Sequence, residues 1–147
     1  MPTVLICSDA AWVHEDVKAC LPGGDTVVRS LSNGRSVRAA VETEAPDLVI
    51  LDMQISDMGA IAVTYDLHLE ESGGRLPAVP VLLLLDRNAD TFMAQQCKAD
   101  GWLIKPLDPI RLRKAMRAVM AGDGYVDRPQ VGDASTNYRP TADSTAR

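Results

Sequence analysis

The stretch DLVILD, residues 47–52, decides how this chain folds. Pro46 precedes this stretch, and its apolar residues, 48–51, are uninterrupted between two aspartates. A short apolar run of this kind is typical of a strand that is buried on both faces of a sheet. The stretches TVLIC (3–7) and VPVLLLL (79–85) have the same character. Strands of this kind predict a parallel sheet with helices packed on both faces.

Segments with helical periodicity alternate with these strands along the chain. We expect strands at residues 3–7, 26–31, 47–52, 79–85 and 101–104. We expect helices at residues 10–20, 34–45, 60–71, 89–99 and 108–122, with Asn33 as a possible cap of the second. The last helix is the best defined, because Asp108 is a good N-cap, Pro109 suits the first turn and Gly122 suits the end. This order predicts a doubly wound α/β sandwich.

The composition fits one globular domain of 147 residues with a net charge of −5. No apolar run is long enough to span a membrane, and the first ten residues do not resemble a signal peptide. The cysteines, of which there are three, are widely spaced and fit reduced thiols better than a disulfide frame or a zinc site. The negative charge disfavours direct binding of nucleic acid. We therefore expect a cytoplasmic protein that binds neither membrane nor nucleic acid.

Residues 122–147 differ from the rest of the chain. They are rich in Gly, Pro, Ser and Thr and contain no Leu, Ile or Phe. Such a composition is typical of a flexible C-terminal tail or linker. We therefore expect the folded domain to comprise residues 1–121.

Polar residues follow four of the five expected strands. Ser8 and Asp9 follow the first, Asp52 ends the third, Asp86 follows the fourth and Lys105 follows the fifth. Because ligands of this architecture bind beyond the carboxyl ends of the strands, these side chains are expected to meet at one rim. Taken singly, Asp9 and Asp86 could cap the helices that follow them, and Lys105 could be a solvated loop residue. Their joint occurrence favours a functional site.

Three segments resemble response-regulator receiver domains: VLICSD (4–9), PDLVILDMQISDMG (46–59) and WLIKP (102–106). The resemblance extends through all five βα units. It implies a flavodoxin-like (βα)5 fold, a three-layer sandwich around a five-stranded parallel sheet of order 2-1-3-4-5.

The resemblance also implies a phosphotransfer site. Asp52 matches the aspartate that accepts the phosphoryl group, and Lys105 matches the lysine that stabilises its charge. Asp9, Asp52 and the backbone carbonyl of Gln54 would bind Mg²⁺, and Trp102 occupies the position of the aromatic switch residue. A sensor histidine kinase or a phosphotransfer protein would supply the phosphoryl group. The chain would then be a signalling domain and not an enzyme.

The chain departs from this family at the site itself. Ser8 stands where the family usually has an acid, which predicts weaker Mg²⁺ binding. Leu85 stands where the family has a Ser or Thr that senses the phosphoryl group, and leucine can donate no hydrogen bond. Without that hydroxyl, we expect Trp102 to pack on Leu85 in one fixed rotamer. Ser56 replaces the usual proline in the loop after the third strand.

Asp86 stands where the family usually has a small residue, and two interpretations are open. It could pair with Lys105 and hold the lysine away from Asp52. Alternatively, it could supply the metal-binding charge that is missing at Ser8. In either case its charge repels a phosphoryl group unless a cation intervenes, so we expect it to increase the dependence of phosphorylation on metal.

Two functions remain open. The chain could accept phosphate on Asp52 and signal through contacts on the side of the fourth and fifth strands and the fifth helix. It could instead be an atypical pseudo-receiver, a module for interaction or dimerisation that needs no phosphorylation. An aspartyl phosphohydrolase is disfavoured because Gln54 stands where a second acid is usual, and CSDAAW (7–12) lacks the glycines of a nucleotide-binding turn.

The fifth helix is basic in an acidic chain. It could present a solvated face, or it could contact an acidic partner or a second copy of the chain as a homodimer. The output partner is not indicated. The basic residues are Arg111, Arg113, Lys114 and Arg117.

Overall fold

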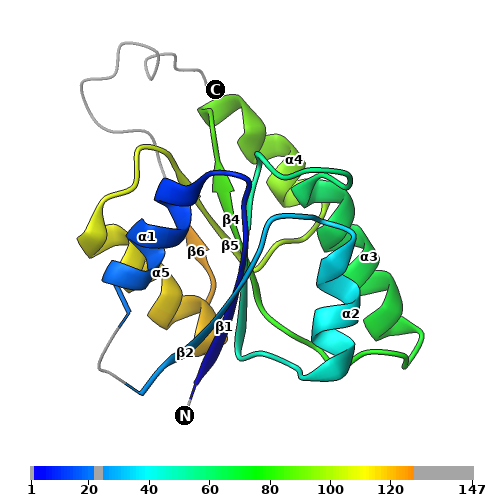
Figure 1. The fold of residues 1–147 in the computed structure, drawn as a ribbon. Helices are drawn as coiled ribbons and strands as arrows, with labels where there is room; N and C mark the ends of the chain where they lie inside the picture. Colours follow the sequence, from blue (N-terminus) through cyan, green and yellow to red (C-terminus); the bar gives the residue numbers. More distant parts are fainter. Residues whose placement is uncertain (1, 22–24, 128–147) are drawn as a thin grey trace.

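A computed structural model describes residues 2–21 and 25–127 of the chain (Figure 1). The strands in this part are β1 Thr3–Cys7, β2 Val27–Leu31, β3 Leu48–Asp52, β4 Val81–Leu85, β5 Gly101–Ile104 and β6 Tyr125–Val126. They form one parallel sheet in the order β2-β1-β3-β4-β5-β6. The predicted doubly wound fold and the order 2-1-3-4-5 are confirmed, with one short strand added at the edge.

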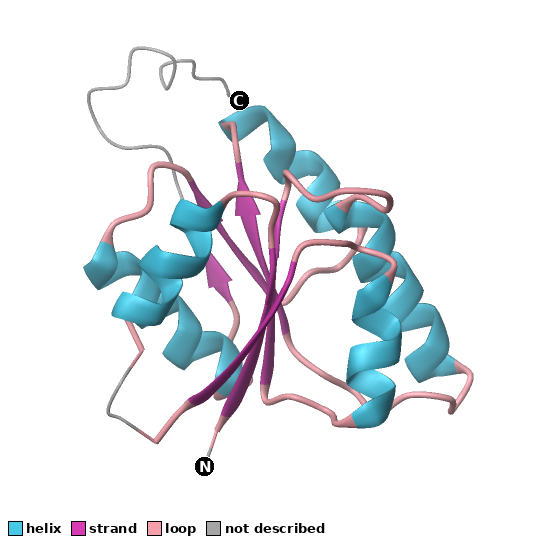
Figure 2. Cartoon of the chain, in the orientation of Figure 1, coloured by secondary structure: helices cyan, strands magenta, loops and turns pink. Residues whose placement is uncertain are grey.

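Helices cover both faces of this sheet. They are α1 Ala11–Ala19, α2 Ser36–Thr43, α3 Ala60–Ser72, α4 Thr91–Gln96 and α5 Pro109–Met120, with a 3₁₀ turn, η1, at Asn88–Asp90. Helices α1 and α5 lie on one face, and α2, α3 and α4 lie on the other (Figure 1). The three layers are visible in Figure 2, where the strands stand between two groups of helices. No helix within the described ranges is long and apolar enough to cross a membrane.

The core explains why the three apolar runs form central strands. Every residue of β1, β3 and β4 is buried. Alternate side chains point to opposite faces, so that Leu83 packs toward α2 and α3 while Leu84 packs toward α1 and α5. Burying each large apolar side chain contributes about 1.5–3 kcal/mol relative to exposure. Leucine side chains on both faces of the sheet therefore stabilise the fold.

The predicted helix ends are right in some places and wrong in others. Asp108 caps α5 as expected, since its carboxylate accepts a hydrogen bond from the amide of Ile110 at 3.0 Å. Asn33 instead accepts from the amide of Arg35, in the turn that leads into α2. Helix α4 is shorter than predicted, because η1 takes the place of its start and the chain leaves the helical conformation near Lys98, whose φ is +60°.

The sixth strand lies in the segment that we expected to be a flexible tail. Strand β6 pairs with the start of β5. Asp127 follows it and is buried; its carboxylate accepts from the amide of Ile104 at 2.8 Å and from the guanidinium of Arg111. The strand is held by these tertiary contacts and not by local propensity. For this reason it could not be predicted from the composition of the segment. Residues 128–147 of the predicted tail lie outside the described residues.

Candidate functional site

Asp52 lies at the centre of the carboxyl rim of the sheet. It ends β3, and its side chain is fully buried. Its Oδ1 accepts a hydrogen bond from Nζ of Lys105, and its Oδ2 accepts one from the hydroxyl of Ser8 at 2.5 Å. A buried carboxylate costs free energy unless it is paired and hydrogen-bonded. Here both oxygens have a partner, and the partners come from the ends of β1 and β5.

Lys105 is shared between two carboxylates. Its Nζ donates to Asp52 and, at 2.8 Å, to Oδ1 of Asp86. The same Nζ lies 5.6 Å from the ring centroid of Trp12. Burial acts to lower the pKa of Lys105, but the bonds to Asp52 and Asp86 outweigh it and the net shift is upward. Lys105 is therefore a fixed cation at neutral pH. Asp86 does pair with the lysine, but it does not hold the lysine away from Asp52.

Asp9 lies in the loop after β1, where its side chain binds the loop after β3 and does not cap α1. Its carboxylate accepts from the amide of Ser56 at 3.1 Å and from the hydroxyl of Ser56 at 2.8 Å. Its own amide donates to the backbone carbonyl of Gln54 at 2.9 Å. The amide of Ala10, which precedes α1, instead donates to the hydroxyl of Ser8 at 3.0 Å. The loops after β1 and β3 are thereby tied together.

The oxygen atoms of this rim are of the kind that Mg²⁺ prefers. Asp9 and Asp52 supply carboxylates, and the carbonyl of Gln54 lies beside Asp9. Within the described ranges, however, no three His, Cys, Asp or Glu side chains form a group that could hold a metal ion. The candidate donor set is thus two carboxylates and one carbonyl, and both carboxylates also accept hydrogen bonds from protein groups.

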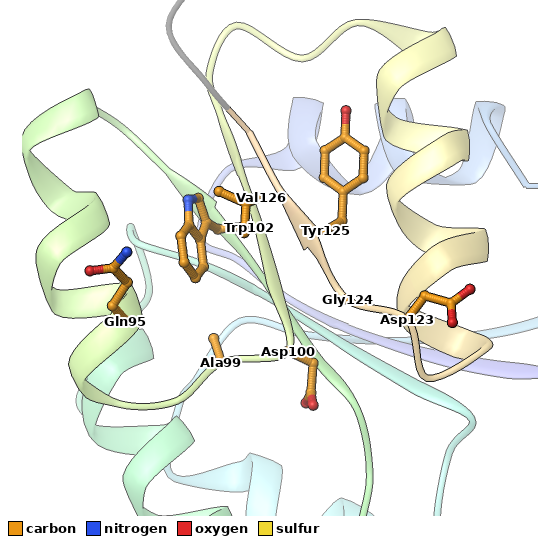
Figure 3. A pocket seen from close by; sticks show the side chains of 8 residues that line it. All are labelled: Gln95, Ala99, Asp100, Trp102, Asp123, Gly124, Tyr125 and Val126. Carbon is orange, nitrogen blue, oxygen red and sulfur yellow. The ribbon is translucent and has the colours of Figure 1, made fainter.

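Leu85 of β4 and Trp102 of β5 belong to the hydrophobic cluster on the face of the sheet that α2, α3 and α4 cover. Leu85 is fully buried, and Trp102 is 5% exposed in the same hydrophobic cluster. The indole Nε1 of Trp102 is buried without a hydrogen-bond partner in the described part of the chain. Figure 3 shows Trp102 between Gln95 of α4 and Val126 of β6, at a hollow that these residues line. Trp102 and Leu85 share this cluster, and the expected direct packing of Trp102 on Leu85 in one rotamer stays a prediction.

Cys7 lies just before Ser8 and does not contribute a reactive group. Burial, and then the charges of Asp9 and Asp52, raise the pKa of its thiol to about 12. Because the thiolate is the reactive form, this thiol is inert at neutral pH.

Two contacts of the site, by Ser56 and Trp12, and one at the edge of the sheet, by Asp127, were not predicted from the sequence. Ser56 was noted only as a replacement for proline, Trp12 as a helix residue and Asp127 as part of a tail. A serine in the loop after β3 is a weak signal, and nothing in the local sequence marks Trp12 or Asp127. Each of the three contacts a residue that is distant in the sequence. Ser56 contacts Asp9, Trp12 contacts Lys105 and Asp127 contacts Arg111.

Comparison with known proteins agrees with the fold. Residues 4–117 match the response regulator receiver domain family. The chain is 28% identical to the nitrate/nitrite response regulator NarL of Escherichia coli, over 99% of this chain and 67% of NarL. It is 25% identical to PilH of Pseudomonas aeruginosa, over 83% of this chain and 100% of PilH. A putative response regulator of Chloroflexus aurantiacus superposes with a TM-score of 0.73 at 22% identity, over 82% of this chain and 99% of that one.

The chain therefore belongs to the response-regulator receiver family, whose members are modules of two-component signalling. NarL is longer than this chain, which spans about two thirds of it.

Proposed function

We propose that this receiver domain accepts a phosphoryl group on Asp52 from a histidine kinase or a phosphotransfer protein. The observation that carries the proposal is the contact of buried Asp52 with Lys105 at the rim of the sheet. An unmodified carboxylate of this kind is a competent nucleophile when a cation stabilises the charge of the incoming group.

The geometry favours Oδ1 of Asp52 as the attacking atom. Oδ1 faces Lys105, whose side chain is 11% exposed, while Oδ2 is held by the buried Ser8. As Oδ1 forms a bond to phosphorus, the bond from phosphorus to the donor breaks, and the donor keeps that electron pair. Oδ2 then becomes the carbonyl oxygen of an acyl phosphate. Lys105 stays in contact with the new phosphoryl oxygens.

Asp9, Asp52 and the carbonyl of Gln54 are the groups that would hold Mg²⁺. When bound, the ion supplies positive charge to the phosphoryl oxygens. Ser8 contributes no charge to this set, and Asp86 places a further carboxylate on Lys105. We therefore propose that phosphorylation needs more Mg²⁺ than it would without Asp86.

The output surface in this proposal is the side of β4, β5 and α5. The basic residues of α5 are partly used within the domain, since Arg111 binds Asp127 and Arg113 donates to the carbonyl of Cys20 at 3.3 Å. Lys114 and Arg117 are exposed. These two residues are the basic pair that α5 offers to a partner or to a second copy of the chain.

An alternative function, that of a phosphorylation-independent pseudo-receiver, is supported by Leu85. This leucine is fully buried where a hydroxyl would sense the phosphoryl group. The two functions differ in whether an acyl phosphate forms.

Intact-mass analysis after treatment with acetyl phosphate or carbamoyl phosphate and Mg²⁺ separates the two. We expect a phosphate adduct on the wild type that is lost with Asp52→Asn and after removal of Mg²⁺ by a chelator. The matched control is Asp57→Asn, which changes an exposed carboxylate in the loop after β3 and should keep the adduct. An unlabelled wild type would favour the pseudo-receiver.

A further inference from the structure

The start of α1 is connected to both groups that hold Asp52. Ser8 donates to Oδ2 of Asp52 at 2.5 Å and accepts from the amide of Ala10 at 3.0 Å. Lys105 donates to Oδ1, and its Nζ lies 5.6 Å from the ring centroid of Trp12 in the first turn of α1. A single side chain, Ser8 or Lys105, thus connects each carboxylate oxygen of Asp52 to the start of α1.

We propose that Ser8 and Lys105 are positioning residues that carry the phosphorylation state of Asp52 to the first turn of α1, where Trp12 responds. This inference rests on the proposed function, because it needs an acyl phosphate at Asp52. It gives the domain a route for its signal that does not use position 85.

The first connection runs through the hydroxyl of Ser8. Ser8 is 1% exposed, so its single proton is given to Asp52 and not to water. When Oδ1 bonds to phosphorus, Oδ2 loses its share of the negative charge and becomes a carbonyl oxygen. Hydrogen bonds to ionised groups are roughly twice as strong as neutral ones, so the hold of Asp52 on the proton weakens. The carbonyl of Ala10, 3.5 Å from the same hydroxyl oxygen, is the alternative acceptor.

The second connection runs through Lys105. Its ammonium is shared among Asp52, Asp86 and the ring of Trp12. A phosphoryl group brings more negative charge to the side of Asp52 and draws the ammonium toward it. Attraction between a cation and a ring requires the cation to lie within about 6 Å of the centroid, so a small movement of Lys105 alters the contact. Trp12 is 47% exposed and has room to respond.

Trp102 provides an internal comparison. It is 5% exposed and packs in the cluster of Leu85, which has no hydroxyl to move. The chain has two tryptophans. One therefore lies on the proposed route, and the other lies at the position that a hydroxyl on β4 would control.

Fluorine NMR of the full chain labelled with fluorotryptophan tests the proposal. The two signals are assigned with Trp12→Phe and Trp102→Phe, and spectra are recorded with Mg²⁺ before and after addition of acetyl phosphate. Intact mass of the same samples gives the phosphorylated fraction. We expect the Trp12 signal to shift in proportion to that fraction and the Trp102 signal to stay in place.

The variant that tests Ser8 is Ser8→Ala. Because one of the two connections is lost and the charge-assisted bond with it, the shift of Trp12 per phosphorylated molecule should fall to roughly half. Thr64→Val is the control: it removes a fully buried hydroxyl that donates to Ala60 within α3, and it should leave both the shift and the adduct unchanged.

The outcomes separate this inference from the function on which it rests. A wild type that forms no adduct overturns both. An adduct with an unmoved Trp12 signal, or a shift that moves Trp102 instead, overturns the inference alone. A shift per phosphorylated molecule that is equal in Ser8→Ala and in the wild type removes Ser8 from the route.

Discussion

Two buried ion pairs of this domain use the same chemistry in different ways. Asp52 pairs with Lys105 at the rim, and Asp127 pairs with Arg111 at the edge of the sheet; the exposed fractions of the two carboxylates are 0% and 6%. Asp52 binds two side chains, and its lysine is shared with Asp86. Asp127 binds one side chain and one backbone amide. The rim pair can therefore exchange partners, whereas the edge pair holds a strand in place.

The largest expected effect comes from Lys105→Met at the rim. It leaves the carboxylate of Asp52 buried without its cation, so the free energy of unfolding should fall by about 3–5 kcal/mol. Urea denaturation followed by circular dichroism measures this. The control Lys114→Met changes an exposed lysine of α5 and should stay within about 0.5 kcal/mol of the wild type.

The double variant Asp52→Asn with Lys105→Met sharpens this result. Because the buried charge is removed together with its partner, much of the lost stability should return. A loss below about 1 kcal/mol in Lys105→Met would show that water, and not the lysine, compensates Asp52.

At the edge pair, Asp127→Ala should cost less. It removes the hydrogen bond from the amide of Ile104, which is worth about 1.5–3 kcal/mol because the acceptor is charged. The ion pair with Arg111, whose side chain is 22% exposed, adds little to this. The free energy of unfolding should fall by that amount, while labelling of Asp52 by acetyl phosphate should persist. Hydrogen exchange should show faster exchange at the amide of Ile104. Lost labelling would mean that the edge and the rim are not independent.

A smaller effect concerns Cys7 beside the rim. Its pKa is raised by burial and by Asp9 and Asp52 to about 12 from a usual value of 9.0. The folded state therefore keeps a proton that the unfolded state loses, and stability falls as the pH rises from about 9 toward 12. Between pH 8 and pH 10, the wild type should lose about 1 kcal/mol more than Cys7→Ala. Parallel curves for the two proteins would contradict this.

The smallest effect on stability is expected for Asp86→Ala, since the side chain of Asp86 is 34% exposed. Exposed ion pairs contribute about 0–1 kcal/mol. Its effect on function should be clearer: half-maximal labelling by acetyl phosphate should need several-fold less Mg²⁺, because like charges near the phosphoryl group repel it by about 1 kcal/mol or more. Coincident Mg²⁺ titrations of wild type and variant would rule out this role of Asp86.

The sequence predicted the sheet better than its edge. Strands β1, β3 and β4 are buried on both faces, and only apolar residues satisfy that environment, so their positions are visible in the sequence. Strand β6 is two residues long and is held by Asp127 through contacts with β5 and α5. Nothing in its local sequence requires a strand.

The sequence likewise predicted some contacts of the candidate site and not others. A parallel sheet brings the carboxyl ends of its strands to one edge, so the presence of Asp52 and Lys105 on the same rim follows from the fold. The hydroxyl of Ser8 on Asp52, and the ring of Trp12 under Lys105, depend on side-chain positions that strand order does not specify.

By itself, the sequence determined the layers and the rim on which the polar residues meet, because burial on two faces restricts which residue types can stand in a central strand; its resemblance to receiver domains implied the strand order. The tertiary structure decided which partner each polar side chain takes. Lys105 binds Asp52 and Asp86 together, Ser8 replaces a missing acid with a hydrogen bond, and Asp127 ties down a strand. Hydrogen bonds and ion pairs form only when their atoms lie within a few ångströms of each other. The pairing of these side chains therefore depends on the positions of residues that are far apart in the chain.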